Sequence, residues 1–331
     1  MTARVNMAAT VLVTGAAGYI GSVLVRQLLD SGSRVRGFDA LLFGGESLLS
    51  ACAHPRFEFQ KGDLRDDGDV SRALDGVDAV VHLAAIVGDP ACAKHPQLAR
   101  DVNWVATRAL FDRCVETNRI KRFVFASTCS NYGKMRGDGY VNEASPLAPV
   151  SLYAELKVQF EQYLLGANLR DDFVPTALRF STVYGLSPRL RFDLTVNEFV
   201  REVTLGRPLR IFGEQFWRPY CHVEDLARAC LLVLVSDPGL VRQEVFGVGE
   251  TEENYQKKML AQELLKVVPD AKIEYVVRHE DPRDYRVDFS RIRDRLGYRI
   301  TKRVPDGMRE IHKILVDGML LDADSNAYRN V

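Results

Sequence analysis

The stretch Thr14-Gly15-Ala16-Ala17-Gly18-Tyr19-Ile20-Gly21 decides the fold of this chain. It follows the apolar run 11–13, which is typical of a buried strand, and opens a segment, 20–28, with apolar residues at helical spacing. In such a strand–turn–helix unit, Gly15 allows the tight turn, Gly18 lets the backbone approach a pyrophosphate, and Gly21 permits close helix–sheet packing. The helix start offers free N–H groups to an anion. The stretch therefore predicts a phosphate-binding turn.

A carboxylate stands about 20 residues farther on, where dinucleotide-binding proteins hold a ribose. Asp39 ends the second predicted strand and can accept hydrogen bonds from both ribose hydroxyls of NAD. The same charge would repel the 2′-phosphate of NADP. Arg34 and Arg36 enter that strand and do not follow it. We predict NAD as the cofactor, with NADP as the alternative.

Composition excludes several classes of protein. The chain has 331 residues, 47% hydrophobic and 27% charged, so it can bury a core and is not intrinsically disordered. Its 44 Lys and Arg balance 44 Asp and Glu, without the basic excess of a nucleic-acid-binding protein. No apolar run approaches the roughly 18 residues of a membrane span, and residues 1–10 lack the apolar core of a secretory signal. We expect binding to neither nucleic acid nor membrane.

The six cysteines are scattered without a C-x-x-C pair, which is typical of reduced thiols. The histidines show no H-x-x-x-H or H-E-x-x-H pattern, so we expect no metal site. We expect a cytoplasmic protein.

The first half of the chain alternates apolar runs with amphipathic segments. Buried strands are predicted at 11–13, 35–38, 57–59, 79–83 and 123–126, and helices at 96–117 and 151–165, among others. This order predicts an α/β fold: a Rossmann-type doubly wound parallel sheet with a smaller C-terminal α+β substrate lobe.

The alternation loosens after 176–180, which places the predicted domain boundaries. We assign 8–177 to the NAD-binding Rossmann domain, with 220–248 returning to it, 178–219 and 249–318 to the substrate-binding lobe, and 319–331 to a tail. The polar end of that tail, 322–331, is expected to be frayed. Further helices are predicted at 223–235, 252–266 and 305–319.

A tyrosine and a lysine share one face of the predicted helix 151–165. Tyr153 and Lys157 are spaced i, i+4, so their side chains are neighbours. An ammonium beside a phenol is expected to lower the tyrosine pKa, which is normally about 10. Such a tyrosine can exchange a proton with a sugar hydroxyl while a nicotinamide moves a hydride. The spacing alone also fits a surface helix, but beside the glycine turn it predicts a catalytic pair.

These motifs resemble those of the extended short-chain dehydrogenase/reductase superfamily, in the NAD-dependent epimerase/dehydratase branch that acts on nucleotide sugars. The resemblance covers about residues 10–315, including TGAAGYIG at 14–21 and HLAA at 82–85. It implies that NAD is contacted or supported by Gly15, Ala17, Gly18, Tyr19, Ile20, Gly21, Asp39, Asp63, Leu64, Leu83, Ala84, Ala85, Asn103, Ser127, Tyr153 and Lys157.

The segment 125–133, FASTCSNYG, matches the family segment that supplies a catalytic Ser or Thr. The resemblance implies that Thr128 hydrogen-bonds the reacting sugar oxygen beside Tyr153, and that Ser127 supports the loop beside the nicotinamide. By the same resemblance a nucleotide-sugar substrate is contacted by Thr128, Ser181, Arg218 and Arg278, with Arg283 as an alternative to Arg278. Each arginine could instead be an ordinary surface ion-pair residue.

The residues after Thr128 bear on the type of reaction. Family 4,6-dehydratases carry an Asp-Glu pair there, whereas this chain has Cys129-Ser130, so dehydration is disfavoured. Cys129 could exchange a proton with a carbon beside a keto group, as cysteines do in some family epimerases, and it is a candidate catalytic residue. The alternative is a small buried thiol that fills space.

Three functions stay open from the sequence. The first is an NAD-dependent nucleotide-sugar epimerase, which oxidises and re-reduces a sugar carbon, with C4 as the expected position. The second is an NAD(P)H-dependent nucleotide-4-keto-sugar reductase of a deoxysugar pathway. The third is a catalytically silent NAD-binding regulator, against which the intact Thr128, Tyr153 and Lys157 argue. By family analogy, helices 96–117 and 151–165 would pair across a homodimer.

Overall fold

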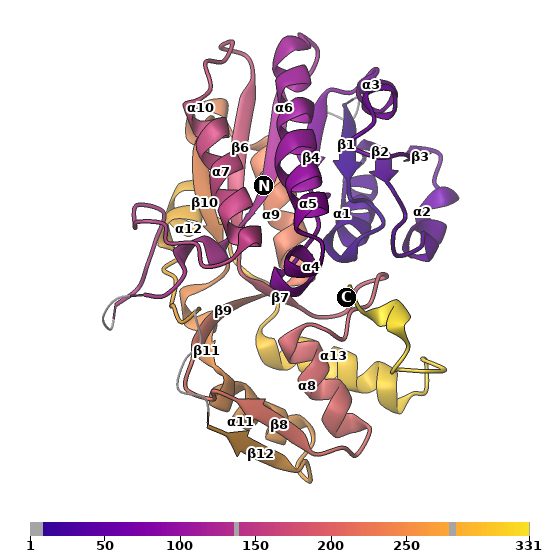
Figure 1. Cartoon of the computed structure of the whole chain (residues 1–331). Coiled ribbons are helices and arrows are strands. Elements are labelled where there is room, and N and C mark those ends of the chain that lie inside the picture. Colours follow the sequence, from indigo (N-terminus) through magenta and orange to yellow (C-terminus); the bar gives the residue numbers. More distant parts are fainter. Residues whose placement is uncertain (1–8, 136–138, 278–282, 331) are drawn as a thin grey trace.

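The computed structural model describes residues 9–135, 139–277 and 283–330. Its centre is a seven-stranded parallel sheet with strand order β10-β6-β5-β4-β1-β2-β3 (Figure 1). In that order the strands are Glu244–Val248, Val174–Phe180, Arg122–Thr128, Ala79–His82, Thr10–Thr14, Arg34–Asp39 and Phe57–Lys61. The order reverses between β1 and β4, so the predicted Rossmann-type fold is confirmed.

Helices cover both faces of this sheet because alternate strand residues point to opposite sides. Val11 and Val13 join the core with the helices of one face, and Leu12 joins the core of the other. The first face carries α1 (Tyr19–Asp30) and α9 (Val223–Val235), and the second carries α3 (Asp67–Leu74), α6 (Thr107–Glu116) and α7 (Leu152–Gly166). Shorter helices are α2 (Leu49–Cys52), α4 (Asp89–Lys94), α10 (Pro238–Val241) and α12 (Ser290–Leu296).

Two predicted helices are interrupted. Over 96–117 the chain forms α5 (Pro96–Arg100), then a π-helical turn (Asp101–Ala106), then α6. The prediction of a helix that begins at residue 252 is wrong, because strand β11 (Asn254–Gln256) comes before helix α11 (Lys257–Val267). Strand β11 pairs with β9 (Trp217–His222), and pairing with a distant segment leaves no trace in local periodicity.

The smaller unit, at the bottom of Figure 1, has a core of its own. It contains β8 (Leu209–Phe212) paired with β12 (Ile273–Val276), and helices α8 (Thr195–Thr204), α11 and α13 (Val304–Val316). A three-stranded sheet, β11-β9-β7 with β7 at Thr182–Tyr184, lies between the two units. Among the helices of the described ranges, none is both long and apolar enough to cross a membrane.

The C-terminal tail is packed, so the expectation of a frayed end is wrong. The Phe192 N–H donates to the Tyr328 carbonyl at 2.8 Å, and the two rings meet edge to face with centroids 5.6 Å apart. Arg207 Nη1 lies 2.8 Å from Asp324 Oδ1. A single aromatic residue in a polar stretch has no periodic signal, and its partner is distant in sequence.

Candidate active site

The glycine turn joins β1 to α1 in a geometry that only small residues allow. Gly15 has φ +72°, and a Cβ there would lie 2.8 Å from the Ala84 backbone nitrogen. A Cβ on Gly21 would lie 2.0 Å from the Gly15 carbonyl oxygen. Gly18 is the N-cap of α1 and offers no side chain to the first helical N–H groups. The helix start is therefore suited to an anion at the carboxyl end of the sheet.

Asp39 ends β2 beside this turn. Its Oδ2 accepts a hydrogen bond from the Ala17 N–H at 3.0 Å, and its Oδ1 accepts one from the Leu41 N–H at 2.8 Å. Burial raises the pKa of this carboxyl, and the two N–H groups oppose that shift. Each carboxylate oxygen keeps a second lone pair for a ribose hydroxyl. The turn and Asp39 together fit the pyrophosphate and ribose of NAD.

The other residues expected near NAD lie along the same edge of the sheet. Residues 83–85 follow β4 and pass the glycine turn, where the Leu83 N–H donates to the Thr14 carbonyl at 3.2 Å. Asp63 accepts a hydrogen bond from Arg65 Nε at 3.0 Å, and this arginine lowers the pKa of the Asp63 carboxyl. Leu64 is buried.

Asn103 holds the loop after β4. Its Oδ1 accepts from the Ile86 N–H at 2.8 Å, and its Nδ2 donates to the Ile86 carbonyl at 2.9 Å. The amide sits on the π-helical turn, a distortion that often occurs at functional sites. Asn103 thus positions the loop beside the cofactor site through both ends of its side chain.

Lys157 is buried in the middle of α7, which begins where the Ser151 hydroxyl accepts from the Ala154 N–H at 3.3 Å. Its Nζ donates to the Ala126 carbonyl at 2.7 Å and lies 5.8 Å from the centre of the Tyr153 ring. Burial lowers the pKa of the Lys157 ammonium to about 7. The predicted helix face is therefore confirmed, and it faces the end of β5.

The expected lowering of the Tyr153 pKa is wrong for this arrangement. Burial raises the pKa of the Tyr153 hydroxyl, Cys92 and Asp89 raise it further, and Arg191 opposes them. The Lys157 ammonium is held by a β5 carbonyl on the other side, so its charge does not offset the cost of burying a phenolate. Tyr153 therefore holds its proton more strongly than a free phenol does.

Thr128 and Ser127 end β5 and point to different partners. Thr128 caps the 3-10 turn Cys129–Tyr132, and its Oγ1 accepts from the Ser130 N–H at 3.1 Å. The Ser127 hydroxyl donates to Glu161 Oε2 on α7 at 2.7 Å and is buried. Ser127 therefore supports the end of the strand from behind.

Cys129 has the surroundings of a packed thiol. It is 1% exposed, and its Sγ donates to the Arg179 carbonyl at 3.3 Å. Burial raises its pKa, and it packs with Tyr132, Tyr285 and Phe289. Of the two interpretations of Cys129, the structure favours the space-filling thiol over the acid–base group.

The residues expected to meet the substrate lie on the smaller unit and its junction. The Ser181 hydroxyl donates to the Val248 carbonyl at 2.6 Å and is already used within the protein. The Arg218 guanidinium stacks on the Tyr285 ring at 5.4 Å. Arg278 lies outside the described residues. Arg283 forms an ion pair with Asp89 of α4 at 3.1 Å, which brings its segment to the Tyr153 side of the junction.

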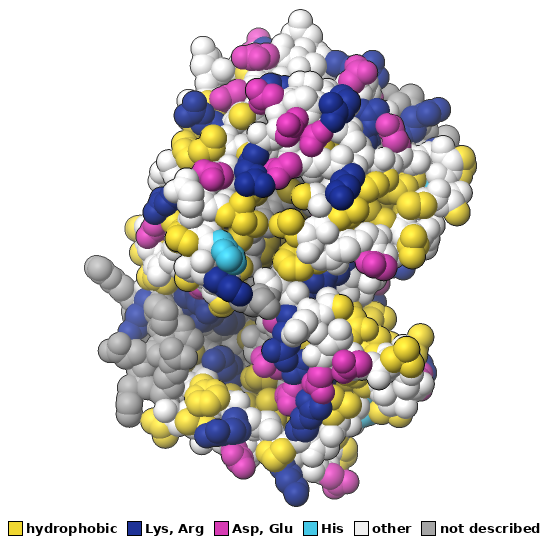
Figure 2. All heavy atoms as spheres, turned by 45° about the vertical axis from the view of Figure 1, so that its right-hand side comes forward, with side chains coloured by type: hydrophobic (Ala, Val, Ile, Leu, Met, Phe, Trp, Pro, Cys, Tyr) yellow, Lys and Arg dark blue, Asp and Glu magenta, His cyan; other side chains and the backbone are white. Residues whose placement is uncertain are grey.

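Figure 2 shows Lys and Arg side chains gathered along the line where the two units meet. Three buried residues that contact the predicted segments were not predicted from the sequence: Tyr285, Glu161 and Arg179. Tyr285 had no motif to mark it. Glu161 did have a signal, because it follows Tyr153 and Lys157 at i+8 and i+4 on the same helix face.

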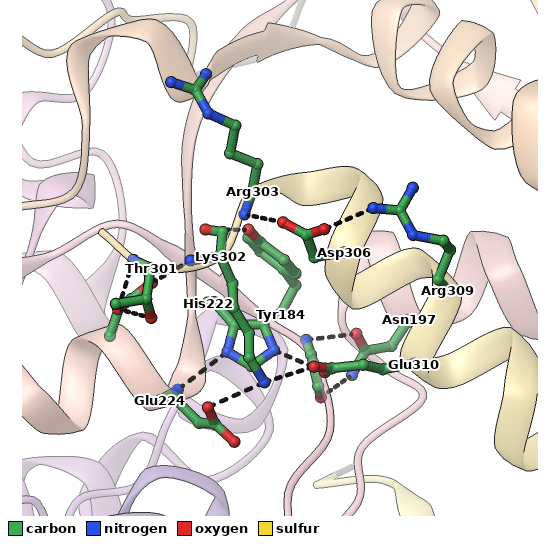
Figure 3. Close-up of polar contacts among 12 residues, drawn as sticks. Tyr184, Asn197, His222, Glu224, Thr301, Lys302, Arg303, Asp306, Arg309 and Glu310 are labelled. Carbon is green, nitrogen blue, oxygen red and sulfur yellow. Dashed lines mark hydrogen bonds and ion pairs between the residues drawn. The ribbon is translucent and has the colours of Figure 1, made fainter. Parts of the chain in front are cut away.

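A polar junction ties α9, β7 and α13 together (Figure 3). His222 Nδ1 accepts from the Glu224 N–H at 3.2 Å, and its Nε2 lies 2.9 Å from Glu310 Oε2. The Lys302 ammonium pairs with both Glu310 and Glu224. The Tyr184 ring packs edge to face on His222, with centroids 5.4 Å apart. These contacts fix the smaller unit against the end of the sheet.

The junction should make stability depend on pH through Glu310. Burial alone would raise its pKa, but His222 and Lys302 lower it to about 2 from 4.5. Because its pKa is lower in the folded than in the unfolded state, ionised Glu310 stabilises the protein above about pH 5. This stabilisation is lost as the pH falls toward 2. We expect Glu310→Gln to reduce the free energy of unfolding by about 2 kcal/mol at pH 7, and urea titrations should show this difference shrinking at pH 3.5. A difference independent of pH would contradict the assignment.

Comparisons with known proteins agree with this geometry. Residues 11–249 match the NAD dependent epimerase/dehydratase family. A UDP-glucose 4-epimerase of Lactobacillus helveticus is 30% identical over 309 residues, which span 87% of this chain and 91% of the relative. A dTDP-glucose 4,6-dehydratase of Actinoplanes sp. is 32% identical over 316 residues, which span 91% of this chain and 95% of the relative.

A solved structure is similar over nearly the whole length. The UDP-glucuronic acid 4-epimerase from Bacillus cereus, in complex with UDP-glucuronic acid and NAD, is 26% identical with a TM-score of 0.81. The similarity covers 93% of this chain and 99% of that one. Because the family match spans well over half of the chain and the fold and glycine turn agree with it, this protein belongs to the NAD-dependent epimerase/dehydratase family of extended short-chain dehydrogenases/reductases.

Proposed function

We propose that this protein is an NAD-dependent nucleotide-sugar epimerase, which oxidises a sugar carbon, with C4 as the expected position, and reduces it again. The observation that supports the proposal is that Lys157, which lies 5.8 Å from the centre of the Tyr153 ring, donates to the Ala126 carbonyl of β5, the strand that Thr128 ends. This set serves a proton transfer coupled to a hydride transfer. A silent regulator has no need of it.

NAD supplies the hydride acceptor and donor when it is bound. Once Tyr153 has lost its own proton, its phenolate would take the proton of the sugar hydroxyl as the carbon is oxidised, and would return it as the carbon is reduced again. Thr128 would orient the sugar oxygen. Burial lowers the pKa of the Lys157 ammonium to about 7, so near neutral pH this group can take up or release a proton close to the phenol. Arg218 would hold the substrate diphosphate, for which a guanidinium is a bidentate partner.

Dehydration is the less favoured reaction, although dehydratases are among the relatives. The positions after Thr128 hold Cys129 and Ser130, which supply no carboxylate. The nearby Glu143 is a separate carboxylate, whose Oε1 accepts from the Gly247 N–H of β10 at 2.7 Å. A 4-keto-sugar reductase would use the same three residues, so it needs a separate test.

Mass spectrometry of the small molecules released from the denatured native protein tests the proposal. We expect the denatured protein to release stoichiometric NAD. In a separate activity assay without added cofactor, we expect the native protein to interconvert UDP-glucose and UDP-galactose, or another nucleotide-sugar pair. A protein that releases no NAD, and that oxidises NADH or NADPH only when given a 4-keto nucleotide sugar, would be a reductase instead.

Asp39 should determine the coenzyme. Asp39→Asn removes the charge that would repel a 2′-phosphate but keeps the acceptor that pairs with the Ala17 or Leu41 N–H. We expect the ratio of NAD to NADP affinity to fall by roughly 10-fold or more. Isothermal titration of cofactor-free protein measures both affinities. An unchanged ratio would show that Asp39 does not face the ribose.

We further propose a homodimer built on α6 and α7, by analogy with the family. Both helices line one surface pocket, through Phe111, Val115 and Tyr163 among others. Light scattering at micromolar concentration should give twice the 37.2 kDa chain mass, whereas a monomer would refute the proposal.

A further inference from the structure

The face of α7 that carries the catalytic pair continues into the core. Tyr153, Lys157 and Glu161 follow one another at i, i+4 and i+8. Glu161 is 1% exposed, and nothing in the proposed chemistry uses it. A buried carboxylate needs a partner, because desolvation strongly disfavours an isolated charge.

That partner is Arg179 on β6. Its Nε lies 3.1 Å from Glu161 Oε1, its Nη2 lies 2.5 Å from the same oxygen, and the arginine side chain is 4% exposed. Burial alone would lower the pKa of Arg179, but Glu161 and Tyr132 raise it above its usual value, so the guanidinium keeps its charge. The two residues form a compensated ion pair beneath the active site.

The pair also holds the turn that follows Thr128. Glu161 accepts from the Ser127 hydroxyl at 2.7 Å, and Asn131 Nδ2 donates to Ser127 Oγ at 3.1 Å. Arg179 Nη1 donates to the Tyr132 hydroxyl at 3.0 Å. Because the residues on both sides of Thr128 are bound, the direction of its hydroxyl depends on this buried network.

The pair is linked to Lys157 through the end of β5: the Lys157 Nζ donates to the Ala126 carbonyl, and the next residue, Ser127, donates to Glu161. The titratable and charged groups on the elements around Lys157 are His82, Cys92, Asp89, Tyr153, Glu161 and Arg179, and of these Cys92 acts on the Lys157 charge directly. Burial, with the charge of Lys157, lowers the pKa of His82 to about 3, and burial raises that of Cys92 to about 11. Both are neutral near pH 7. Asp89 is bound by Ser151 and Arg283.

We propose that the Glu161–Arg179 ion pair is a positioning element of the active site: it fixes the turn that orients Thr128, and it keeps the net charge one helical turn from Lys157 at zero. The inference rests on the proposed function for its kinetic consequence only. Removing Glu161 should leave the Arg179 cation uncompensated, whereas removing Arg179 should let the buried Glu161 carboxyl take up a proton.

The sign of that charge gives a readout that a purely structural role does not predict. Glu161→Gln leaves the Arg179 cation, which cannot lose its proton, and should lower the Lys157 pKa by about 1 unit. Arg179→Met leaves a buried Glu161 that can take up a proton, so the Lys157 pKa should change little. In the double variant the Lys157 pKa should return to the wild-type value. NMR of protein labelled with 13C at lysine Cε measures it, with the Lys157 signal assigned by Lys157→Arg.

Kinetics test the orientation of Thr128. In Glu161→Gln we expect kcat to fall roughly 10- to 100-fold with little change in KM, because the turn loses its anchor while the substrate site is untouched. The double variant should keep a low kcat, since an amide opposite methionine cannot anchor the turn. If Glu161→Gln fails to fold, Ser127→Ala provides the substitute test. It removes one hydrogen bond to Glu161 without leaving a charge unpaired, and it should also lower kcat.

Glu253 provides a matched control in the smaller unit. It is a buried carboxylate that pairs with Arg303 Nη1 at 3.1 Å and accepts from the Val304 N–H at 3.1 Å. Glu253→Gln should lower the melting temperature but leave the Lys157 pKa and kcat unchanged. The proposal is overturned if the Lys157 pKa and kcat are the same in folded Glu161→Gln and wild-type protein.

The proposed function can fail separately. A wild-type protein that converts no nucleotide sugar would refute the epimerase, but the NMR titrations need no substrate and would still decide whether the pair sets the charge at Lys157.

Discussion

Replacement of Tyr153 by Phe is expected to lower kcat roughly 10³-fold while the protein keeps its NAD. The change removes one hydroxyl and leaves the ring, whose neighbour Lys157 stays bound to the Ala126 carbonyl. The hydroxyl is the group that would exchange a proton with the sugar, and no second tyrosine occupies its position on α7. The effect should appear in turnover of the nucleotide sugar at saturating concentration, with NAD content measured on the same sample.

Tyr163→Phe is the matched control. It lies on the same helix, but its hydroxyl donates to Asp112 at 2.6 Å, away from β5. We expect its turnover to stay within about threefold of wild type. Equal turnover in Tyr153→Phe and Tyr163→Phe would remove Tyr153 from the mechanism.

The second large effect is expected at the glycine turn. In Gly21→Ala the new Cβ would lie 2.0 Å from the Gly15 carbonyl oxygen and 2.9 Å from Ala16 backbone atoms. Backbone atoms cannot rotate away, so the turn must move as a whole, and we expect a loss of about 3 kcal/mol in unfolding free energy. Because the same turn forms the pyrophosphate site, NAD content should fall to roughly a tenth or less.

Gly166→Ala, at the end of α7, controls for the substitution itself. A Cβ there meets no atom within 4 Å. It should leave NAD content unchanged and alter stability by less than about 1 kcal/mol. If Gly21→Ala behaves like Gly166→Ala, the tight contact between turn and helix does not limit cofactor binding.

Candidate catalytic residues were predictable where they lie close together in sequence. Tyr153 and Lys157 are one helical turn apart, and Thr128 stands in a short motif at a strand end. The direction of the Tyr153 pKa shift was not predictable, because it depends on burial and on Cys92 and Asp89 from another segment. The role of Cys129 was open for the same reason: its packing partners Tyr285 and Phe289 come from the far end of the chain.

The α/β architecture, the glycine turn and the helix face with Tyr153 and Lys157 could all be inferred from local patterns, because each depends on spacing within about 20 residues. Which buried groups meet is a property of the folded chain. Glu161 and Arg179 are joined across two elements, and Tyr328 packs on Phe192. Such contacts depend on chain segments that converge in space, and desolvation by the surrounding core sets their charges, so no local pattern encodes them.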